Sequence, residues 1–266
     1  MQKKDVLNLL HAIHPRIHCL TNPVTMRDVA NILLAADGSA VMARDPDEVE
    51  EITSICHGTL LNTGVPDEKI IRACILAGKK ANQLGHPVIL DPVGAGASTF
   101  RRKLLADLLE SVQPTIVRCN QEEAAVLYSM KAGGFSVTDH AGVESALRLP
   151  PEDLRSLASD VSKLYQCTFL ITGSSDVVSD GRLTLFLTGG DARIRRITGG
   201  GCMLSALCAL FAGTGIEPFD AALIAGQIWR DSAEYAGIRT DKNGQGIGSF
   251  HVYLTDALEE QIFERS

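Results

Sequence analysis

Short apolar runs alternate with longer amphipathic stretches along most of this chain. Continuous apolar runs of four or five residues are typical of strands buried on both faces, and apolar residues three and four positions apart are typical of helices. We therefore predict strands at 16–20, 38–42, 59–62, 87–91, 115–118 and 168–172. The helices predicted between or after them are 25–36, 46–56, 66–84, 98–109, 121–128 and 152–164. This alternation predicts an α/β fold, with a mostly parallel central sheet and helices on both faces.

Residues at the predicted boundaries agree with these elements. Asp45 precedes Pro46, which places a capping carboxylate before a proline at the first helical position. Asp67 and Glu68 put negative charge into the first turn of the helix that follows Pro66. Gly85 stands where a glycine commonly ends a helix.

The pattern changes after residue 172. Two short apolar runs flank Asp180-Gly181, a strong signal for a two-residue hairpin, so we expect an antiparallel edge of the sheet. Helices are predicted at 202–212, 218–235 and 252–263. Residues 129–150 are the least regular segment, and we expect a surface excursion there. Because there is no repeat and no clear linker, we predict one domain over residues 1–266.

Composition narrows the function classes. The chain is 45% hydrophobic and 21% charged, which is ordinary for a globular protein, and it has no apolar run long enough to span a membrane. Seven scattered cysteines without a Cys-x-x-Cys pair favour reduced thiols in a cytoplasm over disulfides or a zinc site. A net charge of −7 without a basic block argues against nucleic acid as a partner.

The most informative segment is Thr198-Gly199-Gly200-Gly201-Cys202, followed at once by a predicted helix. Glycines allow a tight turn, and a helix N-terminus presents unpaired N–H groups, which together form an anion site suited to phosphate. We hypothesise that the amides of residues 199–202 hold a phosphoryl group, and that the pKa of the Cys202 thiol falls beside them. The alternative is a simple turn that precedes a buried helix with a core cysteine.

Ligands of parallel sheets bind beyond the carboxyl ends of the strands, where this chain has polar residues. Asp91 ends an apolar strand, and Glu123 lies three residues after Asn120. Two such carboxylates suit Mg2+, which takes few protein ligands beside phosphate oxygens. The structural alternatives are a cap or loop hydrogen bond for Asp91 and a capping box formed by Asn120 and Glu123.

Arg118 closes another strand and offers a planar fork to phosphate oxygens, unless it only pairs with Asp91 or Glu123. The hydroxyl of Thr172 could contact phosphate or cap a turn. The chain lacks a P-loop motif, and the Gly94-Ala95-Gly96 segment is not followed by the third glycine of a dinucleotide fingerprint.

Taken together, five ordered motifs resemble the hydroxyethylthiazole kinase family. They are Cys19-Leu-Thr-Asn22-Pro-Val-Thr, Met42-Ala-Arg-Asp-Pro-Asp-Glu48, Asp91-Pro-Val-Gly-Ala-Gly96, Arg118-Cys-Asn120-x-x-Glu123 and Thr198-Gly-Gly-Gly-Cys202-Met-Leu. The resemblance implies a ribokinase-like fold and transfer of the ATP γ-phosphoryl group to the hydroxyl of 4-methyl-5-(2-hydroxyethyl)thiazole in thiamine salvage. It also implies Mg2+, and a homotrimer with active sites between subunits.

The resemblance also implies roles for single residues. Those expected at the thiazole are Asn22, Met42, Gly64 and Gly199; those at ATP are Arg118 and Thr172; those at the metal are Asp91 and Glu123; and Cys202 is catalytic, where relatives place an aspartate base. Cys119 departs from the family, which usually has glycine there, and we expect its side chain to crowd ATP. Two alternatives stay open: another ribokinase-like small-alcohol kinase, and a catalytically weak thiazole- or thiamine-binding homologue.

Overall fold

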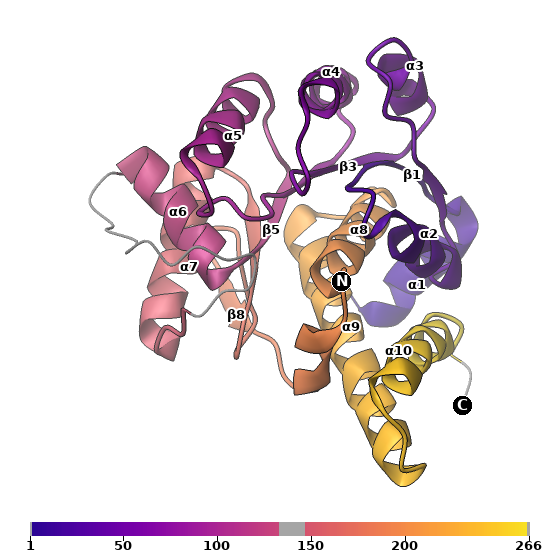
Figure 1. The fold of residues 1–266 in the computed structure, drawn as a ribbon. Coiled ribbons are helices and arrows are strands. Elements are labelled where there is room, and N and C mark those ends of the chain that lie inside the picture. Colours follow the sequence, from indigo (N-terminus) through magenta and orange to yellow (C-terminus); the bar gives the residue numbers. More distant parts are fainter. Residues whose placement is uncertain (1, 133–146, 265–266) are drawn as a thin grey trace.

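The computed structural model describes residues 2–132 and 147–264, and these contain one mixed sheet covered by helices (Figure 1). The strands are β1 (Arg16–Leu20), β2 (Ser39–Val41), β3 (Gly58–Asn62), β4 (Val88–Asp91), β5 (Ile116–Asn120), β6 (Thr168–Thr172), β7 (Val177–Ser179) and β8 (Thr184–Phe186). Their order in the sheet is β2-β1-β3-β4-β5-β6-β7-β8. Pairing is parallel from β2 to β6 and antiparallel from β6 to β8, which confirms the predicted fold class and edge hairpin.

Two layers of helices cover the two faces of the sheet (Figure 1). One layer holds α1 (Lys3–Ile13), α2 (Met26–Ala35), α8 (Gly200–Ala212), α9 (Pro218–Lys242) and α10 (Ile247–Ile262), and the other holds α3 (Val49–Ser54), α4 (Glu68–Leu84), α5 (Thr99–Ser111), α6 (Gln121–Ala132) and α7 (Pro151–Tyr165). On β4, Ile89 packs in the first core cluster while Val88 and Leu90 pack in the second. This alternation is what a strand buried on both faces requires.

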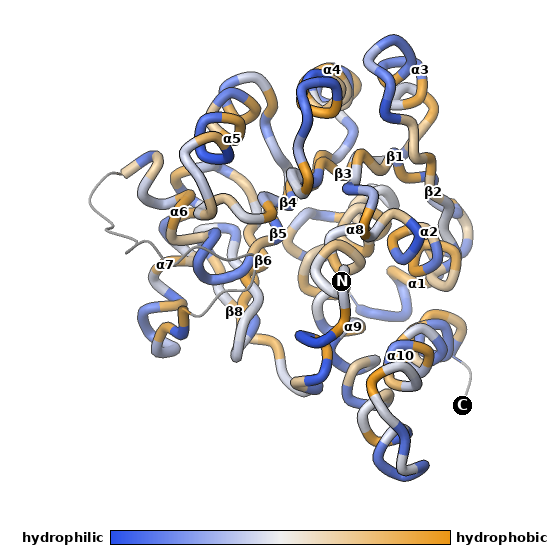
Figure 2. The backbone as a smooth tube through the Cα atoms, viewed as in Figure 1, coloured by the Kyte–Doolittle hydropathy of each residue, from blue (hydrophilic) through white to orange (hydrophobic). Residues whose placement is uncertain are grey.

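Helix α8 lies in the interior of the molecule. It packs between the sheet and both α2 and α9, and every residue from Cys202 to Ala212 is buried. A helix that is apolar on all sides needs such a place. Figure 2 shows the complementary pattern outside, with hydrophobic colour along the central strands and hydrophilic colour on the outward turns of α3 and α4. In the part of the chain that the structure describes, no helix is both long enough and apolar enough to cross a membrane.

Local capping sets both ends of α4, as predicted, but not the start of α3. Asp67 caps α4 by accepting a hydrogen bond from the Ile70 amide, and Gly85 ends that helix with a φ of 69°. The predicted cap at Asp45 is wrong, since α3 begins only at Val49. The Asp45 carboxylate instead accepts the amide hydrogen of Asp47 and closes a turn ahead of the helix.

Other boundaries depend on distant contacts. Helix α9 continues past residue 235 to Lys242 because Ala236, Gly237 and Thr240 are buried, and α10 packs along α9. Helix α10 begins earlier than predicted, at Ile247, and a 3-10 helix, η1 (Ala192–Arg196), was not predicted. Of the predicted excursion at 129–150, residues 129–132 belong to α6, and residues 133–146 lie outside the described residues.

Candidate active site

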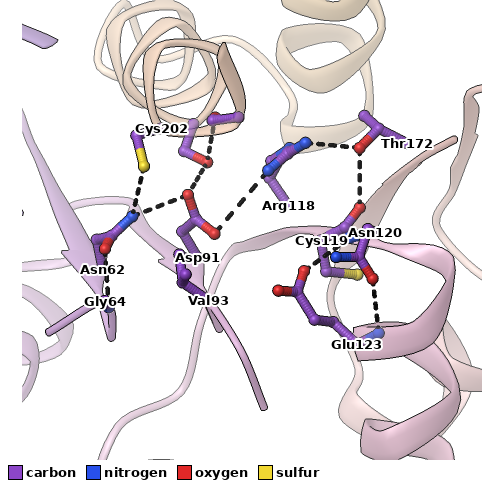
Figure 3. Close-up of polar contacts among 12 residues, drawn as sticks. Asn62, Gly64, Asp91, Val93, Arg118, Cys119, Asn120, Glu123, Thr172 and Cys202 are labelled. Atoms are coloured by element: carbon purple, nitrogen blue, oxygen red, sulfur yellow. Dashed lines mark hydrogen bonds and ion pairs between the residues drawn. The ribbon is translucent and has the colours of Figure 1, made fainter. Parts of the chain in front are cut away.

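Strand pairing brings the polar strand ends together along the C-terminal edge of the sheet, where the carboxyl ends of the parallel strands lie. The parallel register places Asn62 of β3 opposite Asp91 of β4, and Asn120 of β5 opposite Thr172 of β6. Strand β1 lies between β2 and β3, so the strand order reverses there, which is where open α/β sheets usually bind ligands. The candidate site lies at this edge, beneath the first turn of α8 (Figure 3).

The glycine-rich bend meets this edge through two different glycines. Gly199 precedes α8 with a φ of 80°, a conformation that residues with a Cβ rarely adopt. Gly201 lies against the guanidinium of Arg118, and a Cβ at this position would collide with it. One turn later, the Ser205 hydroxyl contacts Asp91 Oδ2 at 2.8 Å. The bend, Asp91 and Arg118 are therefore neighbours in space.

The backbone amides of the bend are not all free. The Gly200 amide donates to Ile197 O at 3.3 Å, so the expectation of four free amides fails at this residue. In the part of the chain that the structure describes, the amides of Gly201 and Cys202 have no such carbonyl partner. They are the two amides in the first turn of α8 that are available to an anion, and the Gly199 amide just before the helix also lacks such a partner among the described residues.

Asp91 is completely buried, and its two carboxylate oxygens differ in their contacts. Oδ2 accepts hydrogen bonds from Asn62 Nδ2 at 3.0 Å and from Ser205 Oγ at 2.8 Å. Oδ1 has no hydrogen-bond partner, and the nearest cation is Arg118, with Nη1 at 4.0 Å. Burial raises the pKa of Asp91, while Arg118, Ser205 and Asn62 act in the opposite direction. The carboxylate thus keeps one oxygen free for a cationic ligand.

Arg118 extends from β5 toward β6. Its Nη2 donates to Thr172 Oγ1 at 2.6 Å, and its Nε is buried without a hydrogen-bond partner. The neighbouring residue, Cys119, is fully buried in the cluster that contains Ala124 of α6. Because side chains alternate along a strand, the Cys119 thiol faces away from Arg118, so crowding of ATP at Arg118 receives no support.

Asn120 and Glu123 form the capping box that the sequence offered as the structural alternative to a metal site. Glu123 Oε2 accepts the Asn120 amide and its Oε1 accepts the Gly94 amide, both at 2.8 Å, while Asn120 Oδ1 accepts the Glu123 amide at 2.8 Å. Burial, followed by the charge of Asp91, raises the pKa of Glu123 to about 7. This carboxylate therefore ties two loops together, and its role at a metal stays a prediction.

Cys202 sits in the first turn of α8 and is 7% exposed. Its Sγ lies 3.3 Å from Asn62 Nδ2 and 3.7 Å from Asn22 Nδ2. The predicted fall in its pKa is wrong. Burial raises the pKa of the thiol and Asp91 adds to that effect, which outweighs the opposite effects of Thr25, Arg118 and Asn62. The thiol is consequently neutral near pH 7.

The residues expected at a thiazole fall into two groups. Asn22, Gly64 and Gly199 lie around Cys202: the Gly64 amide donates to Asn62 Oδ1 at 2.9 Å, and Gly199 packs on Thr25. A Cβ at residue 64 would lie 2.8 Å from Asn22 Nδ2 and 2.9 Å from Asn62 Oδ1, so a larger residue would displace these two amide groups. Met42 follows the edge strand β2 and is half-buried against the core cluster that includes Cys202.

Four residues of this region were not predicted as site residues: His18, Thr25, Asn62 and Ser205. Asn62 had one signal, a polar residue at the end of a buried strand. Buried His18 bonds Thr53 Oγ1 through Nδ1 and Ala43 O through Nε2, both at 2.9 Å, and so fixes the loop after Met42. Burial lowers the pKa of His18. No three His, Cys, Asp or Glu side chains among the described residues are grouped to share a metal ion.

Comparison with known proteins gives consistent matches over nearly the whole chain. Residues 7–264 match the model of the hydroxyethylthiazole kinase family. A protein of Alkaliphilus oremlandii called hydroxyethylthiazole kinase is 40% identical over 96% of this chain and 93% of its own length. One of Exiguobacterium sibiricum with the same name is 40% identical over 95% of this chain and 94% of its own.

Solved structures agree. The hydroxyethylthiazole kinase protein of Pyrococcus horikoshii matches with a TM-score of 0.85 and 30% identity, over 99% of this chain and 96% of that one. A Bacillus subtilis pyridoxal kinase, solved as an ADP complex, matches with a TM-score of 0.58 and 16% identity over 84% of this chain and 92% of that one. This second likeness concerns the fold alone.

Proposed function

Since this chain belongs to the hydroxyethylthiazole kinase family, we propose that it transfers the γ-phosphoryl group of ATP to the hydroxyl of 4-methyl-5-(2-hydroxyethyl)thiazole, a step of thiamine salvage. The observation that carries the proposal is the free oxygen of buried Asp91, which lies beside Arg118 and the start of α8. Buried polar atoms without partners are rare in folded proteins and commonly mark the place of a ligand.

Phosphoryl transfer depends mainly on positioning and on the neutralisation of charge on the moving group. In the proposed arrangement, Arg118 and Thr172 bind the phosphates of ATP, and the amides of Gly201 and Cys202 receive the transferred group. The hydrogen bond from Arg118 Nη2 to Thr172 fixes the orientation of the planar guanidinium.

The residues present fit a Mg2+ ion. Asp91 Oδ1 is a buried carboxylate oxygen without a hydrogen-bond partner, and Mg2+ usually takes one or two protein carboxylates together with phosphate oxygens. We propose that Asp91 holds the ion and that Glu123 adds negative charge nearby. When bound, Mg2+ would neutralise part of the charge of the triphosphate.

Cys202 is the proposed catalytic residue, and its neutral thiol defines what it can do. It can exchange hydrogen bonds with the acceptor hydroxyl and orient it, and a loose transition state requires little prior deprotonation. Asn22, Met42, Gly64 and Gly199 are the proposed contacts of the thiazole. Asn22 contacts the sulfur of Cys202, the Gly64 amide donates to Asn62, and Gly199 immediately precedes α8.

We propose a homotrimer with active sites between subunits, acting in the cytoplasm. Two large apolar side chains next to proposed thiazole residues support such an interface: Val24 is 62% exposed and Val65 is 51% exposed. All seven cysteines are free and buried, as expected for a reducing compartment. Sedimentation analysis of the purified chain tests the trimer.

The deciding experiment is mass spectrometry of the products after incubation with Mg-ATP and the thiazole alcohol. The phosphate ester of the thiazole together with ADP supports the proposal. ADP release with other alcohols, but not with the thiazole, would identify another ribokinase-like small-alcohol kinase. Calorimetric binding of the thiazole without turnover would identify a binding homologue that has lost catalysis.

A further inference from the structure

Asn62 is the most highly connected polar side chain of the candidate site, and none of the proposed roles includes it. It ends β3, is 2% exposed, and lies opposite Asp91 in the parallel register. Its Nδ2 approaches Asp91 Oδ2 at 3.0 Å and Cys202 Sγ at 3.3 Å. Its Oδ1 accepts from Asn22 Nδ2 at 3.1 Å and from the Gly64 amide at 2.9 Å.

The orientation of this amide group follows from one of these contacts. A backbone N–H can only donate, so the atom that faces the Gly64 amide must be the oxygen of Asn62. The NH2 group then faces Asp91 and Cys202, and its two hydrogens are used by these two acceptors. Asn22 is fixed in turn, because its Oδ1 accepts the Val24 amide and its NH2 therefore faces Asn62.

We infer that Asn62 is a positioning residue of the phosphoryl transfer, which holds the sulfur of Cys202 and the carboxylate of Asp91 at a fixed separation with one planar amide. This inference rests on the proposed function. The amide group of Asn62 donates a hydrogen bond to Asp91 Oδ2, so Oδ1 is the oxygen left for a ligand. It donates to the sulfur, so the thiol hydrogen stays available to the acceptor hydroxyl.

The first test compares Asn62→Leu with a matched control on the same strand. Leucine has the same branched shape and the same number of side-chain heavy atoms as asparagine, but it makes none of the four hydrogen bonds. Thr59→Val is the control, because Thr59 is also buried in β3 and its hydroxyl has no hydrogen-bond partner. We expect Asn62→Leu to lower kcat about 100-fold with a less than threefold change in KM for ATP, since misplaced reacting groups typically cost this much. Thr59→Val should match the wild type.

The second test needs no substrate and measures the reactivity of the thiol. The full-length chain is treated with iodoacetamide at pH 8, and alkylation of Cys202 and Cys208 is followed by tandem mass spectrometry. Cys208 lies on the same helix, is fully buried, and reports opening of the fold. The amide donor stabilises the thiolate that reacts, so Asn62→Leu should alkylate Cys202 about threefold more slowly, with Cys208 unreactive.

A merely structural role has the opposite signature. Loss of packing would expose the start of α8 and accelerate alkylation of both cysteines, and that result, or an unchanged rate at Cys202, overturns the inference. If Asn62→Leu does not fold, Asn62→Ser takes its place with the same expected directions. A wild-type protein that does not phosphorylate the thiazole would refute the proposed function, while the alkylation rates would still decide the role of Asn62.

Discussion

The two halves of the candidate site differ in the charge of the polar groups that they leave without a hydrogen-bond partner. Around Cys202, the neutral amides of Asn22 and Asn62 are hydrogen-bonded to one another and to the backbone. Around Arg118, two buried atoms of charged side chains have no hydrogen-bond partner, namely Asp91 Oδ1 and Arg118 Nε. The hydroxyls of Thr21 and Thr25 on the neutral side also lack partners among the described residues, but they carry no charge. A paired amide network is rigid without a ligand, whereas unpaired buried charge is costly until a ligand completes it. The neutral half is therefore built for shape and the charged half for phosphate.

Substitution of Arg118 should have the largest effect, because it removes the cation of the charged half. We expect Arg118→Met to lower kcat/KM at least 1000-fold, the range typical of arginines that stabilise phosphoryl transfer. Arg118→Lys keeps the charge but loses the planar fork, so its loss should be smaller. Steady-state ADP release measures both variants. Arg118→Met with more than a tenth of wild-type activity would contradict the division into halves.

Gly201→Ala tests the junction between the halves. The added methyl group would overlap the Arg118 guanidinium, while the helical backbone at this position accepts alanine. We expect kcat to fall about 100-fold through displacement of the arginine, with the protein still folded. The control is Gly248→Ala in α10, where a Cβ meets no atom within 4 Å. Equal activity of both variants would show that turnover does not depend on the present position of Arg118.

Cys202→Ser probes the neutral half, and a smaller effect is expected. A hydroxyl preserves hydrogen bonding but is shorter and less polarisable than a thiol, so we expect kcat to fall about tenfold without loss of stability. Thermal unfolding and ADP release on the same preparation give the two quantities. Unchanged turnover would remove Cys202 from the mechanism.

Glu123→Gln should produce the smallest effect, and chiefly on stability. The pKa of Glu123 is raised from 4.5 to about 7, so its protonated form stabilises the fold below pH 4.5, and this contribution is lost as pH rises through about 7. Glutamine does not titrate, so the free energy of unfolding of the variant should vary less over this range. Loss of one amide acceptor should also cost about 1 kcal/mol. Urea unfolding at several pH values checks both expectations, and identical pH slopes would contradict the first.

The sequence predicted the parts of this molecule that depend on local pattern. Apolar runs located the strands of the sheet, and the rule for strand ends singled out Asp91 and Arg118, which the structure places side by side. The cap expected at Asp45 and the free amide expected at Gly200 fail through local turns, and the larger errors involve long-range contacts. The extent of α9 depends on its packing against α10, and the pKa of Cys202 depends on burial that no local pattern reveals.

Asn62 illustrates the same limit within the site. Its side chain matters only because the register of β3 and β4 places it opposite Asp91, and because α8 crosses above both strands. Neither the register nor the crossing can be obtained from the residues around position 62. Glu123 is the converse case, since its capping box is a local pattern that the sequence already offered.

The burial of α8 has a consequence for how this protein tolerates change. The helix that fills the centre of the molecule also carries Cys202 and the two free amides at its tip. Any replacement along its length that tilts or slides it, even at Ala209 or Leu210 on far turns, would carry those groups away from the strand ends. Substitutions in α8 are thus expected to lower the turnover rate even where they leave the protein folded.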